Sequence, residues 1–422
     1  MSSGISSSDS SSPPQNLRLS SLFNYPSPTV TYDHNLAVPT KISTFLPPGL
    51  LTPISSVHSL FQVNPDPIGK GSQAIVFQGR PVLSDDGSTS EAAQPGDLVA
   101  IKAVKMDHLS TKKRWVRLGR EVAILKNLRH PHILHLEGAY CSVNRIYLVT
   151  EFLAGGELFD YIIARGYFPE TESRSYLRQI ASALVYLHAN GIIHRDLKPE
   201  NILLVKRKPF ARLKLCDFGY AKYLDPRSLM QHSACGSPMY AAPEVFGNLP
   251  YSVDADVFSL GVIMFILLVG YSPFNPSRED DDSMLKVVSS FSAEEAFLDP
   301  AWSDISEAAK DLIKMSILHG SQGRIRAADF LNHPWMLGRT SLAAVRPDAA
   351  ELARRNRFEN SPPGVRESML AMPIVDALRS SFPPPIDFDL DDPVADDAFP
   401  LFSSDTDLSS ASDSDLLADD LN

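Results

Sequence analysis

Two stretches near the middle of the chain carry residues whose types and spacing suit one chemical task. Residues 194–203 read HRDLKPENIL, and Asp217 opens the tripeptide DFG twenty-one positions after Asp196. Moving a γ-phosphoryl group to a hydroxyl requires oxygen ligands for Mg²⁺, a carboxylate that receives or orients the hydroxyl, and a cation near the developing charge. Asp217 and Asn201 suit the metal, Asp196 the hydroxyl and Lys198 the charge. This pattern predicts phosphoryl transfer.

A second cation and a further carboxylate stand upstream. The run DLVAIKAV at 97–104 has the composition of a strand and contains Lys102. A helix is expected after it, because four apolar residues recur at 3, 4, 3 spacing: Trp115, Leu118, Val122 and Leu125. Glu121 lies one turn before the last of these. A lysine that faces a phosphate pocket gains from a carboxylate that fixes its side chain and offsets its charge.

The stretch IGKGSQAIVF at 68–77 has two glycines, Gly69 and Gly71, that would let a phosphate approach the backbone closely. The third glycine of the pattern G-x-G-x-x-G is replaced by Ala74, so the stretch by itself fits an ordinary hairpin as well. By its distance from Lys102 the stretch resembles the phosphate-covering hairpin of nucleotide-binding enzymes. Nucleotide binding is expected to survive the replacement by Ala74, with some loss of affinity.

Together these motifs resemble the eukaryotic protein kinases. The resemblance extends over about residues 60–336 and includes VAIK at 99–102, HRDLKPEN, DFG and the tripeptide APE at 242–244. It implies an α+β, two-lobed fold, with a small N-terminal lobe of antiparallel sheet and one helix and a larger helical C-terminal lobe. It also implies ATP and Mg²⁺ as cofactors.

The resemblance assigns site residues by position. The catalytic residues are Asp196, Lys198 and Asn201, and the metal ligands are Asn201 and Asp217. The residues expected to bind the nucleotide are Ile68, Gly69, Gly71, Val76, Ala100, Lys102, Glu121, Glu151, Leu153, Leu203 and Asp217. Among these, Val76 is expected against the adenine, and Lys102 is expected to bind the α- and β-phosphates and to pair with Glu121. Glu151 to Leu153 are expected at the hinge, with Thr150 as gatekeeper.

Three further positions fit structural roles in the same family. Arg324 is placed to pair with Glu244 of the APE motif, and Asp256 begins an element in which Phe258 stands where the family usually has Trp.

The chain is most similar to serine/threonine kinases. KPEN at 198–201 is typical of that class, and Ser237 stands where the class places a hydroxyl beside the catalytic groups. LAGGELFDYI and CGSPMYAAPEV are most like the calcium/calmodulin-dependent group, which includes relatives of AMP-activated kinase. No obvious basic amphipathic helix follows the domain, so the sequence does not support control by calmodulin.

Regulation and substrate preference follow from the same resemblance. Arg195 and Lys222 are expected to bind a phosphate on Ser233, added by an upstream activating kinase or by the chain itself. Glu157 and Glu200 are expected to attract basic residues upstream of the target hydroxyl in protein substrates, although ordinary exposed acids explain them nearly as well.

Composition divides the chain into a folded body and two tails. Residues 1–55 are rich in Ser and Pro and are expected to be disordered, and 56–336 form the domain, with a surface insertion at about 81–97. Residues 337–380 are expected to be a mostly disordered linker. The tail 381–422 holds twelve Asp and no Lys, Arg or His, so it accounts for the net charge of −11 and leaves a nearly neutral body. A neutral body gives no electrostatic case for nucleic-acid binding.

The compartment is expected to be cytoplasmic or nuclear. The first forty residues have no apolar core of a secretory signal, and three scattered cysteines favour reduced thiols. The uncharged run VFSLGVIMFILLVG at 257–270 is too short to cross a bilayer and fits a buried helix. No membrane partner is expected, and the oligomeric state stays open.

Two alternatives remain. One is a catalytically inactive pseudokinase that binds nucleotide as a scaffold, although none of the key residues is missing. The other places the main function in the acidic tail, which would recruit partners under the control of the kinase domain.

Overall fold

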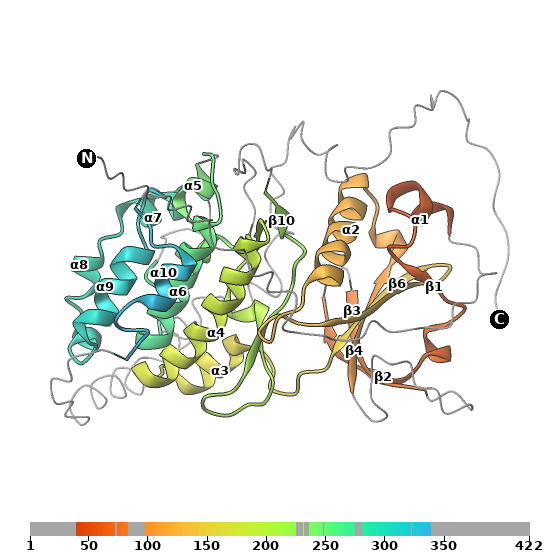
Figure 1. Ribbon diagram of the computed structural model, residues 1–422, viewed down its shortest axis with the longest axis horizontal. Helices are drawn as coiled ribbons and strands as arrows, with labels where there is room; N and C mark the ends of the chain where they lie inside the picture. Colours follow the sequence, from red (N-terminus) through yellow and green to blue (C-terminus); the bar gives the residue numbers. More distant parts are fainter. Residues whose placement is uncertain are drawn as a thin grey trace, which may run out of the picture.

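The described part of the chain forms two lobes (Figure 1), one built on a sheet and the other mainly on helices. This confirms the predicted α+β, two-lobed architecture. The structure, a computed structural model, describes residues 39–71, 74–82, 98–224, 231, 236–247, 249–274, 281–321 and 323–338. The predicted insertion from residue 83 on, most of the linker and the acidic tail lie outside these ranges.

The N-terminal lobe contains a six-stranded sheet with the order β1-β5-β6-β4-β3-β2. Neighbouring strands are antiparallel, except that β1 runs parallel to β5. The strands are β1 (Thr52–Pro53), β2 (Phe61–Lys70), β3 (Ala74–Pro81), β4 (Val99–Lys105), β5 (Leu136–Cys141) and β6 (Arg145–Glu151).

The two faces of the sheet carry different apolar clusters. Ile101 and Ala103 of β4 pack with Tyr147 and Val149 of β6 on one face. Because successive side chains of a strand point to opposite faces, Lys102 lies on the other one. That face packs against the helix α2 (Lys112–Asn127).

Helix α2 forms where the apolar spacing predicts it. Thr111 caps its N-terminus by accepting a hydrogen bond from the backbone N–H of Arg114 at 3.3 Å. Trp115, Leu118 and Val122 are buried, as expected for one apolar face. The helix therefore presents Glu121 from a fixed position in the lobe.

The N-terminal boundary differs from the prediction. Residues 39–55 are not structureless: they form the helix α1 (Thr40–Phe45) and strand β1. The side chains of Ile42, Leu46 and Leu51 are buried in the main core. The Ser/Pro-rich composition that suggested disorder is mainly that of residues 1–38. The residues after Pro39 contain more apolar side chains, and the composition of 1–55 as a whole hides this difference.

The C-terminal lobe is organised around two long helices. In α4 (Glu170–Ala189) one face is fully buried, made by Leu177, Ile180, Leu184 and Leu187. Helix α6 (Asp254–Val269) is buried on nearly all sides. The remaining helices are α3 (Leu158–Arg165), α5 (Pro243–Phe246), α7 (Asp281–Ser290), α8 (Ala293–Ala296), α9 (Glu307–Ser316) and α10 (Ala327–Asn332).

Short strands carry the loops that face the other lobe. They form two antiparallel pairs, β7 (Ile192–Ile193) with β10 (Lys222–Tyr223) and β8 (Ile202–Leu204) with β9 (Leu213–Leu215). Within the described residues, no helix has both the length and the apolar character to span a membrane. This agrees with the prediction that 257–270 form a buried helix.

Candidate active site

Lys102 and Glu121 form the predicted ion pair. Lys102 Nζ on β4 lies 2.8 Å from Glu121 Oε1 on α2. Burial by itself would lower the pKa of Lys102, but the negative charges of Glu121 and Asp217 outweigh burial, and the pKa is raised. Lys102 is therefore an ammonium ion at physiological pH, close to Asp217.

The hairpin of β2 and β3 covers the site from the N-terminal lobe. Gly69 pairs with Val76 across the hairpin, and Gly71 donates its N–H to the carbonyl of Ala74 at 2.9 Å. Neither glycine has a positive φ, and among the described atoms a Cβ at either position would find its nearest neighbour at 3.7 Å. The fold itself does not require glycine here. Glycine at both positions fits a ligand that approaches the backbone from outside the chain.

The register of the sheet gathers the predicted adenine-side residues on one face. Val76 pairs with Lys102, and Ala100 pairs with Thr150, so all four side chains point to the same side of the sheet. Leu203 of β8 is half-buried, whereas its neighbours Ile202 and Leu204 are buried. Because successive side chains of a strand alternate, Leu203 points away from the core that its neighbours enter. These residues supply the apolar surface that an adenine ring needs.

The hinge after β6 is anchored through Glu151. Its Oε1 accepts hydrogen bonds from Lys214 Nζ at 2.6 Å and from the backbone N–H of His135 at 2.8 Å. Leu153 follows two positions later, in the connection to the C-terminal lobe. The side chain of Glu151 thus fixes the strand end, while Ile68 of β2 stays about half exposed at 49%.

Asp217 is held in a conformation that aims its carboxylate. It has a left-handed backbone (φ 55°), which non-glycine residues rarely adopt, and its Oδ1 accepts the N–H of Gly219 at 3.1 Å. Burial would raise its pKa, but the charge of Lys102 and this hydrogen bond outweigh burial and lower it. Asp217 is therefore ionised and able to bind a cation.

Asp196 lies at the centre of a hydrogen-bonded cluster. Asn201 Nδ2 donates to the backbone carbonyl of Asp196 at 2.7 Å and to its Oδ2 at 2.9 Å. Ser237 Oγ donates to Oδ1 at 2.8 Å, and Lys198 Nζ lies 3.3 Å from Oδ2 and 2.6 Å from Ser237 Oγ. These contacts fix the carboxylate and leave Oδ1 of Asn201 as the amide atom for a cation.

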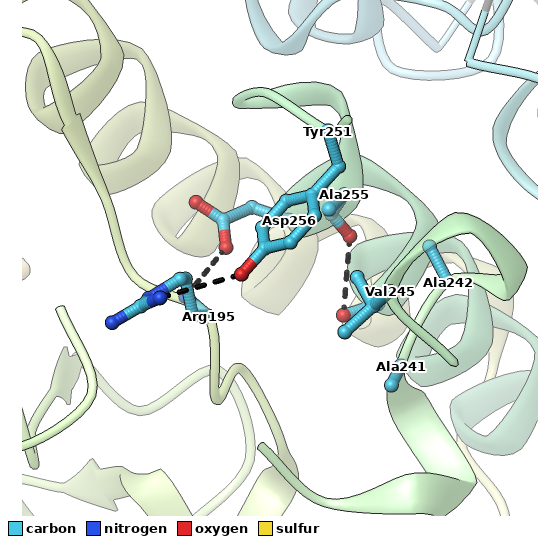
Figure 2. A pocket seen from close by; sticks show the side chains of 8 residues that line it. Arg195, Ala241, Ala242, Val245, Tyr251, Ala255 and Asp256 are labelled. Atoms are coloured by element: carbon cyan, nitrogen blue, oxygen red, sulfur yellow. Dashed lines mark hydrogen bonds between the residues drawn. The ribbon is translucent and has the colours of Figure 1, made fainter. Parts of the chain in front are cut away.

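The loop at residues 194–201, here called the catalytic loop, carries Asp196 and is anchored by Asp256 of α6. Its Oδ2 accepts the N–H of His194 and lies 2.9 Å from His188 Nε2, and its Oδ1 accepts the N–H of Arg195 at 2.9 Å. Figure 2 shows the small cavity beside this anchor, where Tyr251 also approaches Arg195. Arg195 has a left-handed backbone (φ 67°), so the buried carboxylate stabilises a turn that would otherwise be unfavourable.

As predicted, a buried ion pair joins Arg324 to Glu244 of the APE motif. Arg324 Nη1 and Nη2 donate to the two carboxylate oxygens of Glu244 at 2.6 and 3.1 Å. The same guanidinium donates to the carbonyls of Asp254 and Leu318. Phe258, where the family usually has Trp, stacks on Phe274 within the core.

Glu200 and Glu157 form an acidic edge beside the catalytic loop. Burial raises the pKa of Glu200 to about 7, a shift that Lys198 opposes and the charge of Glu157 reinforces. Glu200 Oε2 is buried without a hydrogen-bond partner among the described residues.

The predicted regulatory residues are described only in part. Arg195 donates from Nε to the carbonyl of Tyr220 at 2.7 Å and from Nη1 to the hydroxyl of Tyr251 at 3.3 Å. Lys222 lies in β10, which pairs with β7 just before the catalytic loop. Ser233 lies outside the described residues, so a phosphate site between these three residues stays a prediction.

The sequence did not point to Arg117 of α2. Its Nε donates to the carbonyl of Gly219 at 3.0 Å, and its guanidinium lies 3.4 Å from the ring centroid of Tyr220. Its position one turn before Glu121, on the same side of the helix, was the signal available.

These groups define a phosphotransferase site: a lysine–glutamate pair faces an ionised aspartate, and a second aspartate is held by an amide, an ammonium and a hydroxyl. The comparisons with known proteins agree. The family model described as "Protein kinase domain" matches residues 66–336. The chain belongs to this family, and it is a serine/threonine kinase of the kind that the sequence indicated.

Two kinds of curated relative are similar to it. The calcium/calmodulin-dependent protein kinase type I of Schizosaccharomyces pombe is 43% identical over 244 residues, which cover 57% of this chain and 70% of that protein. The type IV kinase of Homo sapiens is 38% identical over 286 residues, covering 68% of this chain and 56% of that protein. The type IV kinase of Mus musculus is 38% identical over 239 residues, covering 57% and 50%. The chain thus spans about half the length of its mammalian relatives, and nothing in the comparisons favours the inactive alternative.

The site fits the ATP and Mg²⁺ that the family uses in general. Asp217 and Asn201 offer a carboxylate and an amide oxygen, the kind of ligands that Mg²⁺ shares with phosphate groups. Among the described residues, no cluster of three or more His, Cys, Asp or Glu side chains could hold a metal ion. A magnesium ion held by these two residues would complete its coordination with phosphate oxygens and water.

Proposed function

We propose that this chain transfers the γ-phosphoryl group of ATP to serine or threonine hydroxyls of protein substrates that carry basic residues upstream of the target. The observation that supports it most is the cluster around Asp196, in which Asn201, Lys198 and Ser237 all contact one carboxylate. A carboxylate fixed in this way is oriented to accept a hydroxyl proton.

The residues divide the work of the reaction. The substrate oxygen forms a bond to the γ-phosphorus, the bond to the β-phosphate oxygen breaks, and the hydroxyl proton passes to Asp196. Lys198 offsets negative charge beside that carboxylate, and Lys102, held by Glu121, binds the α- and β-phosphates. Asp217 and Asn201 would hold Mg²⁺, which would neutralise part of the charge that collects on the phosphate oxygens.

The acidic edge supports the preference for basic substrates. Glu200 carries a buried carboxylate oxygen without a partner, and Glu157 adds a second acid nearby. A buried carboxylate oxygen without a hydrogen-bond partner costs free energy, and an arginine or lysine of the substrate that pairs with Glu200 would remove this cost.

We also propose that phosphorylation of Ser233 raises activity. Arg195 supports this idea, since its backbone is fixed by Asp256 and its side chain is directed toward the DFG loop through the carbonyl of Tyr220. A dianionic phosphate near Arg195 and Lys222 would form charge-assisted hydrogen bonds that order the segment around Ser233. The kinase that adds the phosphate is not defined by the chain.

The transfer reaction is tested with the purified full chain, ATP labelled on the γ-phosphate and a positional peptide library. We expect label on Ser and Thr but not Tyr, dependence on Mg²⁺, and selection of Arg or Lys upstream. Asp196→Asn serves as the matched control for contaminating kinases. Absence of transfer by the wild type, with nucleotide still bound, would establish the scaffold alternative instead.

The regulatory proposal needs its own experiment. Wild-type chain and Ser233→Ala are compared after treatment with ATP or with a phosphatase, and Ser233 is checked by mass spectrometry. We expect phosphatase to lower wild-type activity to that of Ser233→Ala. Equal activity of the phosphorylated wild type and Ser233→Ala contradicts the proposal.

A further inference from the structure

We infer that residues 39–55, here called the N-terminal cap, are a positioning element of the kinase. They hold α2 in the position in which Glu121 contacts Lys102. The cap precedes residue 66, where the match to the family begins. The inference rests on the proposed kinase activity, but it concerns residues that the family match does not include.

The first contact of the cap is with the start of α2. The ring of Phe45 stacks on the indole of Trp115, with centroids 5.5 Å apart and an interplanar angle of 19°. Ile42 and Leu46 of the cap are 3% and 4% exposed and belong to the same core cluster as Trp115. Figure 1 shows α1 beside α2, on the outer side of the sheet lobe. The stack therefore covers a tryptophan of α2 that belongs to the same core cluster.

The second contact ties the cap to the sheet and to the end of α2. Thr52 and Pro53 pair in parallel with β5, and Ile54 donates its N–H to the carbonyl of Cys141 at 2.8 Å. Lys126 in the last turn of α2 donates to the carbonyl of Gly49 at 3.3 Å. The cap thus spans α2 from its first turn to its last and is fixed to the strand behind it.

This attachment matters for the reaction because α2 carries two groups of the site. Glu121 holds Lys102, and Arg117 holds the carbonyl of Gly219 next to the DFG aspartate. Trp115 lies six residues, less than two helical turns, before Glu121 on the same rigid helix. A shift of the helix start would therefore be transmitted to both contacts.

The cap is packed into the core and is not merely attached to the surface of the lobe. Its apolar residues are absorbed into the continuous core that also contains Leu118 and Val122 of α2. Without the cap, Trp115 would lose its stacking partner, and the outer face of the helix would be open to water. The helix would then populate arrangements in which Glu121 does not reach Lys102.

The main experiment compares full-length variants in steady-state kinetics with a peptide substrate. Phe45→Ala is expected to lower kcat about fivefold or more, with a smaller change in KM for the peptide. Phe45→Leu should recover most of the loss, because it refills the space beside Trp115. The matched control is Phe210→Ala, the same change at a side chain that is 57% exposed in the β8–β9 loop, which should leave kcat unchanged. Removal of residues 1–38 should also leave kcat unchanged, whereas removal of residues 1–55 should lower it at least as much as Phe45→Ala.

A second measurement separates positioning from loss of folding and from failure of the kinase assignment. Hydrogen exchange of the amides of α2 should accelerate in Phe45→Ala, while exchange in α6 stays as in the wild type. On a Glu121→Gln background, Phe45→Ala should cause a smaller further loss of kcat than it does in the wild type, because one of the two contacts through which the cap acts is already gone. Unchanged exchange in α2, or an unchanged kcat of Phe45→Ala, overturns the inference. If the wild type itself proves inactive, the proposed function fails, and the exchange measurement alone decides whether the cap holds α2.

Discussion

Arg117 of α2 and Gly219 of the DFG motif are joined by a hydrogen bond of 3.0 Å from Nε to the backbone carbonyl, although they are 102 positions apart in the sequence. The guanidinium also covers the ring of Tyr220 at 3.4 Å. The N–H of Gly219 meanwhile binds Asp217 Oδ1. One peptide segment is thus held on one side by the helix that carries Glu121 and on the other by the metal-binding carboxylate.

We expect Arg117→Leu to lower kcat about tenfold or more, because a hydrogen bond from a charged donor and a cation–π contact are lost together. Arg117→Lys should fall between Leu and wild type, since an ammonium keeps the charge over the ring but not the planar fork. Steady-state kinetics at saturating ATP provide the measurement. Wild-type kcat in Arg117→Leu contradicts a positioning role.

Asp196→Asn should reduce kcat by about 10²- to 10⁴-fold, the usual contribution of a general base. The thermal unfolding temperature and the affinity for ADP should change little, because Asn can keep the contacts to Asn201 and Ser237. Ser237→Ala removes one of the groups that hold Asp196 and should cost less, about three- to tenfold. A smaller loss in Asp196→Asn than in Ser237→Ala is incompatible with the assigned roles.

Preference for basic substrates should depend on pH through Glu200. Its pKa is raised to about 7, so below pH 7 the carboxyl is largely protonated and loses its attraction for a cation. As the pH rises from about 6 to 8, Glu200 ionises, and the ratio of kcat/KM for an arginine peptide to that for its alanine analogue should increase. Glu200→Gln should abolish this change, and a ratio that is independent of pH in the wild type would count against pairing with Glu200.

The sequence predicted the residues that carry the chemistry of the site better than it predicted the contacts that hold them in place. Asp196, Asn201 and Asp217 could be assigned because their spacing within short motifs is set by local loops. The contact of Lys102 with Glu121 was expected from the resemblance to the protein kinases, in which VAIK at 99–102 marks the strand, and from the apolar spacing that predicts the helix with Glu121. The hydroxyl of Ser237 was placed near the catalytic groups by family resemblance, and the structure brings it onto Asp196.

What could not be predicted depends on contacts between distant segments. Nothing near Arg117 in the chain indicates that its partner is the carbonyl of Gly219. The parallel pairing of Thr52 and Pro53 with β5 joins residues about 90 positions apart, and only the three-dimensional packing reveals it. The N-terminal boundary at 55 failed for the same reason, because a few apolar residues become a cap only when Trp115 is there to receive them.

The pair of Arg324 and Glu244 should matter for stability rather than for binding of ATP. Both side chains are buried, and the contact uses both carboxylate oxygens. Removing one partner leaves a buried charge without its counterion, so Arg324→Met should lower the free energy of unfolding by about 3–5 kcal/mol. Urea unfolding followed by tryptophan fluorescence measures this loss, since Trp302 and Trp335 are fully buried in the same lobe.

Two comparisons make that measurement specific. Arg324→Met combined with Glu244→Gln should be more stable than Arg324→Met alone, because no unpaired charge stays buried. Glu307→Gln, which breaks the exposed pair with Lys310, should change the free energy of unfolding by no more than about 0.5 kcal/mol. If Arg324→Met is as mild as Glu307→Gln, the buried pair does not stabilise the helical lobe in the way that its geometry indicates.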